Sequence, residues 1–569
     1  MKRWQGASRI LAVTLLSLWI AGCSALAATP APRMAESPRP LTATPPLPIA
    51  PSRTPIPSPT PTATPTPDNL WIEAADVRVH PDGGLASGDV VSFQVQAHNG
   101  SRADLSSVPF VVDWGSGRAT GQIASLPHGG RGTADLPWVW DTTAVSGTRA
   151  VTVALDVENV TGDPDTSNNV AVLRLDLAAN RPANEIGATW RTTTSACCTF
   201  HYVGGTAAAR DIQAIVRVAD EAMAFVEGRL NVQQTRPLEV YLISRVLGHG
   251  GFAGETIAIS YVDRDYAGGG LLEVFRHEGT HLLDRRIAGG ERPALLVEGF
   301  AVYVTGGHFK LESLPERAAV LLKAGRTIPL RDLANSFYPS QHESGYLEGG
   351  AFIDYLVQRD GFETFVELYD GMRRQTGESD ADMIDREMRA VYGSGLAELE
   401  REWQTYLRTL AVGDETRDVI DTIALYDTVR RYQRALDPSA YFLGAWIPDL
   451  PQARSRGLIA DYVRHPRSPE NIALETMLIA AHQAFAAQAD DQGEQLLASV
   501  NAVLDAGVAF AEPLAARYLA LVRAALASGY EPQRITIAGD RAEVWATRAG
   551  SSALLPLTAA RQNGVWLLR

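Results

Sequence analysis

Two histidines four residues apart, with a glutamate directly after the first, constrain this chain of 569 residues more than any other feature. They are His277 and His281, and the glutamate is Glu278. Residues four apart lie on one face of an α-helix, so the spacing predicts a helix over 271–284 that presents both imidazoles together. A helical projection puts these polar residues in an arc with apolar ones and leaves a polar arc that ends at Asp284. The motif is therefore expected to point inward.

Buried imidazoles and a buried carboxylate cost free energy unless something compensates them. One Zn²⁺ ion is the simplest compensation, because both imidazoles can reach it while Glu278 addresses a water molecule. The alternative is a chance match or a pair of hydrogen-bonded core histidines. The stretch 293–304 favours the metal, because Glu298 is its only charged residue. A third metal ligand would account for a carboxylate in such an apolar helix.

The stretches H-E-G-T-H and L-V-E-G-F-A-V-Y-V together resemble the gluzincin metallopeptidases of the MA clan, and more narrowly the bacterial families with an E-G-x-A second motif. The resemblance implies an α+β zinc peptidase domain in which His277, His281 and Glu298 hold one Zn²⁺. It further implies that Glu278 is the general base. The strand before the first motif helix, here 254–261, is then expected to be an edge strand along which substrate lies.

The same resemblance implies a tyrosine or histidine, downstream of the third ligand, that stabilises the oxyanion. Tyr346 is the main candidate, because it stands where related sequences carry an aromatic residue before a helix. The alternative role for Tyr346 is ordinary packing at the start of that helix. Weaker candidates are Tyr303, His308 and His342.

One position departs from the resemblance. Thermolysin-like members place an acid four residues after the third ligand, where it orients a histidine, and Val302 stands at that position here. Groups that orient metal ligands affect metal affinity. Asp284, shortly after the second histidine, is the candidate substitute.

The N-terminus indicates the compartment. Positive charges precede an apolar stretch over 10–19 that is too short to remain as a membrane-spanning helix. The following Ile20-Ala21-Gly22-Cys23 resembles a bacterial lipobox, which implies removal of residues 1–22 and attachment of a diacylglycerol to Cys23. The alternative is an ordinary secretory signal. No later stretch is long and apolar enough to span a membrane, so the lipid is the expected anchor and the cell envelope the expected location.

Residues 23–68 read as a linker, because proline stands at nearly every second position of its densest part and favours an extended spacer. Alternating apolar residues over 90–97 and 150–157 then predict half-buried strands, and turn clusters separate them. We expect a β-sandwich over 69–180. The run 165–172 resembles the closing strand of the immunoglobulin-like CARDB domains. That resemblance implies a spacer module or, alternatively, one that binds a protein or cell-surface partner.

The predicted peptidase domain spans 181–412. Within it, apolar spacing predicts a long helix over 207–230, and 238–243 reads as a strand. Cys197 and Cys198 are the cysteines that remain after Cys23 is lipidated. Outside the cytoplasm thiols tend to oxidise, so the pair is expected to form a vicinal disulfide or to pair with other chains. The alternatives are two reduced cysteines on alternate faces of a strand, and a second metal site, which lacks spaced partners.

Residues 413–569 are expected to be mainly helical to about residue 528 and to end in a small β-meander over 534–568. Gly539-Asp540 supplies a hairpin turn in it. Trp545 and Trp566 are expected in the core of this last part.

Two classes of function are compatible with these features. The first is a lipid-anchored zinc metallopeptidase that acts on extracytoplasmic proteins or peptides. The second is a non-catalytic surface protein that binds or adheres to partners and carries a structural or vestigial metal site. Structural zinc sites usually have four protein ligands, and the sequence offers three and retains Glu278, which favours the enzyme. A net charge of −14 with no basic block argues against nucleic acid as a partner.

Overall fold

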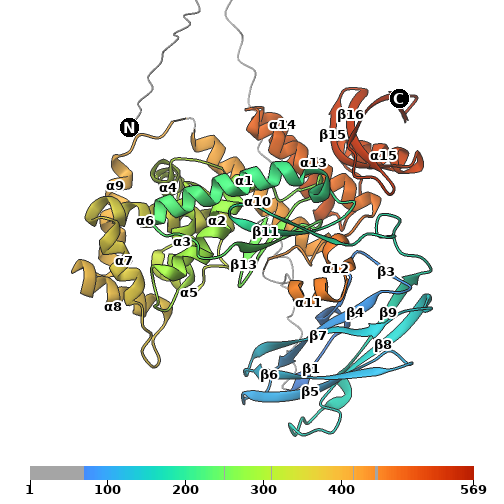
Figure 1. Cartoon of the computed structure of the whole chain (residues 1–569), viewed down its shortest axis with the longest axis horizontal. Helices are drawn as coiled ribbons and strands as arrows, with labels where there is room; N and C mark the ends of the chain where they lie inside the picture. The colour runs from blue at the N-terminus through green and yellow to red at the C-terminus, as the bar shows by residue number, and fades with distance from the viewer. Residues whose placement is uncertain (1–68, 249, 309, 414, 443–445) are drawn as a thin grey trace, which may run out of the picture. The chain divides into compact units, whose positions relative to one another are not determined.

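The computed structural model describes residues 69–248, 250–308, 310–413, 415–442 and 446–569 (Figure 1). The predicted signal peptide over 1–22, the linker over 23–68 and the lipidation site Cys23 lie outside the described residues. Among the helices of the described part, none is both long enough and apolar enough to cross a bilayer.

The described chain begins with a sandwich of two sheets (Figure 1). In one sheet β4 (Val90–Asn99) pairs with β1 (Leu70–Trp71), β2 (Val77–His80) and β7 (Gly130–Asp141). The other has the order β3 (Leu85–Ala86), β9 (Val170–Ala178), β8 (Gly147–Leu155), β5 (Leu105–Asp113) and β6 (Arg118–Leu126). The alternation in the sequence explains this layer, because Val91, Phe93, Val95 and Ala97 all face the buried core. The predicted β-sandwich is confirmed.

A five-stranded sheet follows, with the order β10 (Trp190–Thr194), β11 (Cys198–Val203), β12 (Leu238–Ile243), β14 (Ile257–Ser260) and β13 (Gly251–Ala253). The three inner strands are parallel and the two outer ones antiparallel to their neighbours. The predicted edge strand over 254–261 is therefore wrong. The chain reverses at Gly254, whose N–H donates to the carbonyl oxygen of Thr256 at 3.0 Å. This turn puts β14 inside the sheet and leaves β13 at the edge.

Helix α1 (Ala207–Leu230) connects β11 to β12 and matches its predicted range. It begins at Thr206, whose hydroxyl accepts a hydrogen bond from the N–H of Ala209, and it ends at Asn231 in the left-handed region. The next helix, α2 (Leu271–Leu283), packs directly on α1. A side chain at Gly279 of α2 would lie 2.4 Å from the sulfur of Met223, so this glycine permits the close approach.

The polar arc predicted for this helix is not at the surface. Arg276 is buried and its guanidinium lies 3.8 Å from the ring centre of Phe225, while Thr280 and Asp284 are fully enclosed. The helical projection was wrong on this side because α1 and the later helices cover the face that sequence pattern alone assigns to solvent.

Helix α3 (Ala294–Thr305) packs on α2, and α6 (His342–Asp360) packs on α3. Helices α4 (Leu314–Lys323), α5 (Leu330–Asn335), α7 (Phe362–Gly371), α8 (Asp380–Tyr392) and α9 (Leu396–Thr409) surround them. They share a buried core with the five-stranded sheet. Val419 and Ile423, which follow the predicted boundary at 412, belong to the same core.

The last part contains α10 (Glu415–Leu436), α11 (Leu450–Ser455), α12 (Ala460–Val463), α13 (Pro469–Ala486), α14 (Asp490–Asp505) and α15 (Pro513–Ala527). An antiparallel meander of β15 (Tyr530–Ala538), β16 (Arg541–Arg548), β17 (Leu555–Gln562) and β18 (Val565–Leu568) ends it. Trp566 is buried as expected, but Trp545 is 43% exposed, because it lies on the outer face of β16. The order of these parts confirms the predicted fold class.

The contact between α3 and α6 generates a first prediction. A Cβ atom at Gly299 would lie 2.7 Å from the backbone carbonyl of Gly349, a group that cannot move aside independently. We expect Gly299→Ala to lower the free energy of unfolding by about 1–3 kcal/mol, measured by urea denaturation.

The matched control is Gly228→Ala on the exposed side of α1, where a Cβ meets no atom within 4 Å. Alanine there is expected to raise the free energy of unfolding by about 0.5–1 kcal/mol, because it favours the helix. Equal effects of the two substitutions would contradict the packing account.

Candidate metal centre

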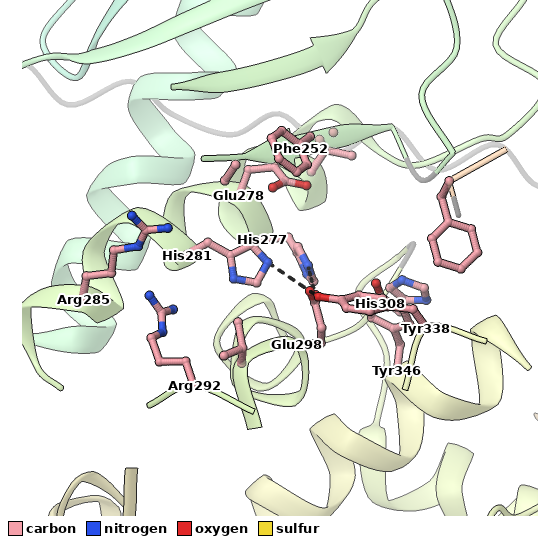
Figure 2. A pocket seen from close by; sticks show the side chains of 15 residues that line it. Phe252, His277, Glu278, His281, Arg285, Arg292, Glu298, His308, Tyr338 and Tyr346 are labelled. Atoms are coloured by element: carbon pink, nitrogen blue, oxygen red, sulfur yellow. Dashed lines mark hydrogen bonds and ion pairs between the residues drawn. The ribbon is translucent and has the colours of Figure 1, made fainter. Parts of the chain in front are cut away.

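Helices α2 and α3 bring three potential metal ligands together (Figure 2). His277 and His281 project from successive turns of α2, and Glu298 projects from α3. Oε2 of Glu298 lies 3.1 Å from Nε2 of His277 and 3.4 Å from Nε2 of His281. Their ligand atoms all lie within 4.8 Å of one another, a separation that one ion of zinc size can span.

The three side chains are largely buried, and the carboxylate of Glu298 faces both imidazoles. Burial by itself would raise the pKa of Glu298, but His281 and His277 act against it and hold that pKa well below its usual range. Nδ1 of His281 is buried and makes no hydrogen bond to any described residue. Two imidazoles and one carboxylate form a donor set typical of zinc, so the residues present fit this ion.

The position that carries the orienting acid in the thermolysin-like pattern is apolar in this chain. Val302 is fully buried at that position, and Asp284 pairs instead with Arg292 and accepts a hydrogen bond from the hydroxyl of Tyr369 at 2.9 Å. Asp284, the predicted substitute, is fully buried and does not lie on an exposed polar side of the helix. Burial raises its pKa, and Arg292 and then His281 act against it, so an orienting role of Asp284 toward His281 stays a prediction.

Glu278 lies beside the metal ligands and not among them. Its carboxylate lines the cavity next to the edge strand β13, and a Cβ atom at Gly251 would lie 2.7 Å from its Oε1 (Figure 2). The pKa of Glu278 is raised to about 7. Burial is the main cause, the charge of His277 acts against it, and the charge of Glu298 adds to it. A carboxylate with a pKa near neutrality is well placed to exchange a proton.

Tyr338 is a site residue that the sequence analysis missed. Its hydroxyl donates a hydrogen bond to Oε1 of Glu298 at 2.7 Å, which leaves Oε2 directed at the two histidines. Tyr338 follows Phe337 in the segment between α5 and α6. A tyrosine between two helices carries no sequence signal that links it to a glutamate forty residues earlier.

The predicted oxyanion residue Tyr346 also lines the cavity. Its ring stacks on the ring of His308 with centres 4.2 Å apart, and its centre lies 6.1 Å from that of His277. Burial raises the pKa of Tyr346 and that of Tyr338 well above 10, and Glu298 raises both further. Both phenols therefore stay protonated and can donate hydrogen bonds.

The weaker candidates are placed differently. His308 lines the cavity, and its Nδ1 lies 2.8 Å from Oε2 of Glu343. His342 packs against Tyr346, with ring centres 4.6 Å apart, outside the cavity wall. Tyr303 lies elsewhere, with its ring 4.8 Å from the guanidinium carbon of Arg229.

The centre opens into a cavity of about 590 Å³. Its walls combine the ligands with apolar and aromatic residues and two arginines: Gly251, Phe252, Ala253, Val274, His277, Glu278, His281, Arg285, Arg292, Val297, Glu298, His308, Tyr338, Tyr346 and Phe442. The three candidate ligands therefore border a cavity large enough to admit other molecules.

Cys197 and Cys198 are joined by a disulfide at the start of β11. Both are buried in the core of the middle part and lie outside the cavity wall. Among the alternatives for this pair, the structure has the vicinal disulfide.

No protein-family profile matches this chain. No curated protein matches it either. Among solved structures, it is similar to the CARDB domain of a Pyrococcus furiosus protein in complex with di-metal ions (18% identity, 19% of this chain and 88% of that chain, TM-score 0.17).

Two peptidase structures align with a larger part. An M1 zinc metallopeptidase from Deinococcus radiodurans has 12% identity over 59% of this chain and 93% of that chain, with a TM-score of 0.26. An aminopeptidase N family protein from Idiomarina loihiensis has 10% identity over 59% of this chain and 75% of that chain, also with a TM-score of 0.26.

The geometry predicts which residues hold zinc. His281→Ala is expected to lower zinc content from about one ion per chain to nearly none, because two ligands cannot retain it. Zinc is measured by elemental analysis after dialysis, and circular dichroism verifies folding. The matched control is His128→Ala on the exposed surface of the β-sandwich, which should keep its zinc. Equal zinc content in both variants would contradict the assignment.

A separate prediction concerns the tyrosine. Tyr338→Phe removes the donor to Oε1 of Glu298 and is expected to weaken zinc binding about 10-fold to 100-fold, since groups that orient ligands have effects of this size. Competition with a chelator measures it. Tyr406→Phe, in the stacked pair with Tyr355 far from the ligands, is the control. An unchanged zinc affinity in Tyr338→Phe would refute this role.

Proposed function

We propose that this protein is a zinc-dependent metallopeptidase that hydrolyses peptide bonds of extracytoplasmic proteins or peptides. One observation carries the proposal: His277, His281 and Glu298 converge within 4.8 Å at an open cavity, and a fourth polar residue, Glu278, lines that cavity without joining the cluster. A site with three protein ligands and a separate carboxylate fits a catalytic metal site better than a structural one.

His277, His281 and Glu298 would hold the metal. When bound, zinc supplies Lewis acidity toward a peptide carbonyl and lowers the pKa of water toward neutrality. Contacts within the chain orient the ligand atoms of Glu298. Glu298 is fixed by the hydroxyl of Tyr338 on one oxygen and faces both imidazoles with the other.

Glu278 acts as the general base in this proposal. Its carboxylate lies at the cavity wall, where it can accept a proton from the attacking water and deliver it to the leaving amine. The close passage of β13 at Gly251 limits where this carboxylate can move. A positioned base of this kind contributes about 10²-fold to 10⁴-fold to a rate.

Tyr338 and Tyr346 are the candidate donors to the carbonyl oxygen of the substrate. Both are protonated at neutral pH and both line the cavity on the Glu298 side. Donors that are already in place stabilise the charge that develops on this oxygen without reorganising.

The edge strand β13 provides the peptide-binding surface. Its outer edge is not paired in the sheet, and Phe252 on it is 58% exposed at the cavity. An extended peptide can add to such an edge through backbone hydrogen bonds. This would lay the substrate past Glu278.

The proposal includes a location. Lipidation of Cys23 would anchor the protein in the bacterial cell envelope, and the proline-rich linker would hold the folded parts away from the membrane. The CARDB-like β-sandwich would serve as a spacer or bind a protein or cell-surface partner.

Glu278→Gln tests the mechanism. It is expected to keep zinc, because Glu278 is not a ligand, and to lower hydrolysis of a quenched peptide library by about 10²-fold or more. Removal of zinc by a chelator should abolish the parent activity, and added zinc should restore it.

Glu273→Gln on the same helix α2, outside the cavity wall, makes the same charge change and should leave activity intact. If Glu278→Gln cleaves peptides at the parent rate, the proposed base is wrong. If the parent holds zinc and cleaves no peptide, the peptidase function fails.

A further inference from the structure

Two arginines line one side of the cavity (Figure 2). Arg285 lies in the short helical turn η3 (Asp284–Arg286) after α2, and Arg292 lies just before α3. Both stand on the His281 side of the centre, opposite Tyr338 and Tyr346. The cavity is therefore asymmetric, with cationic groups on one side and neutral hydrogen-bond donors on the other.

The two guanidinium groups differ in their partners. Arg292 pairs with the fully buried Asp284, and its Nε donates to the hydroxyl of Tyr369 at 3.3 Å. Arg285 is exposed and makes no hydrogen bond or ion pair with any residue that the structure describes. Its charge acts on the carboxylate of Asp284 without a direct contact, so its five N–H donors stay available at the cavity wall.

Arg286, the residue after Arg285, does have hydrogen-bond partners, so arginines of this loop are not unpaired in general. Arg286 donates to the carbonyl oxygen of Gln233 at 2.6 Å and to the hydroxyl of Thr235 at 2.9 Å, outside the cavity. Arg286 thus fixes the loop to the segment that follows α1, whereas Arg285 makes no such hydrogen bond to a described residue.

We infer that Arg285, with Arg292 beside it, forms a carboxylate-binding subsite next to the metal centre, so that the preferred substrates carry a carboxylate close to the cleaved bond. This inference rests on the proposed peptidase function. A guanidinium binds a carboxylate through two parallel hydrogen bonds. A substrate with an apolar side chain over Arg285 would displace water from the guanidinium without replacing the hydrogen bonds of that water. Binding of apolar substrates is therefore disfavoured.

An aspartate or glutamate side chain and a C-terminal carboxylate offer the same chemistry, and three matched peptides separate them. One contains glutamate near the cleaved bond and ends in an amide, the second has glutamine instead, and the third has glutamine and a free C-terminus. The full-length zinc-loaded protein is expected to prefer one carboxylate peptide over the glutamine amide by about 10-fold to 100-fold in kcat/KM, the range of a charged hydrogen bond. The preferred peptide identifies the source.

The variant Arg285→Gln is expected to lose this preference, measured as the ratio of kcat/KM for the carboxylate peptide to kcat/KM for the glutamine amide. Arg286→Gln makes the same change in charge one residue away and should retain the preference. The subsite is refuted if the parent treats the three peptides alike, or if the preference survives in Arg285→Gln, which would mean that another group binds the carboxylate.

Binding of the same peptides to the metal-free full-length protein, measured by calorimetry, separates this inference from the peptidase function. If no peptide is cleaved but binding still favours a carboxylate through Arg285, the subsite stands and the catalytic proposal fails. If peptides are cleaved and neither rate nor binding depends on a carboxylate, the subsite fails and the catalytic proposal stands.

Discussion

The arrangement around the centre depends on one interaction, the contact of the buried Glu298 carboxylate with two imidazoles. An isolated carboxylate in an apolar helix is unfavourable, and the fold compensates it from three directions, with His277, His281 and Tyr338. Bringing the two imidazoles to Glu298 requires α3 to approach α2 closely, and α3 packs closely on α6 as well. Glycines at the helix contacts permit that approach, because no side chain separates the backbones at Gly299 and Gly349.

The same close packing determines what surrounds the centre. The edge strand passes Glu278 at Gly251, so the proposed base, the metal position and the proposed peptide-binding edge lie within one cavity. Tyrosine hydroxyls stand on one side of the centre and arginines on the other (Figure 2). This asymmetry would fix the direction in which a peptide lies, because its carbonyl oxygen would bind on the tyrosine side and its carboxylate on the arginine side.

Local patterns in the sequence predicted the helix over 207–230, the strand over 238–243 and the terminal meander, because each has a clear apolar period or turn signal. Local patterns also predicted the three candidate ligands, because the helical spacing of two histidines and a lone charge in an apolar helix are local signals. Contacts made by distant segments were not accessible. The order of β13 and β14 depends on a tight turn, the burial of Asp284 depends on Arg292 and Tyr369, and Tyr338 reaches Glu298 only in the folded chain.

X-ray absorption at the zinc edge of the zinc-loaded protein reports the atoms around the metal and therefore tests the assigned ligand set. The account predicts one zinc ion with two imidazole nitrogens and one carboxylate as its protein ligands, at distances of about 2.0–2.2 Å. It also predicts that the Glu298→Gln variant changes this ligand shell whereas Glu278→Gln leaves it unchanged. A site closed by four protein ligands, sulfur in the shell, or a shell altered by Glu278→Gln but not by Glu298→Gln would contradict it.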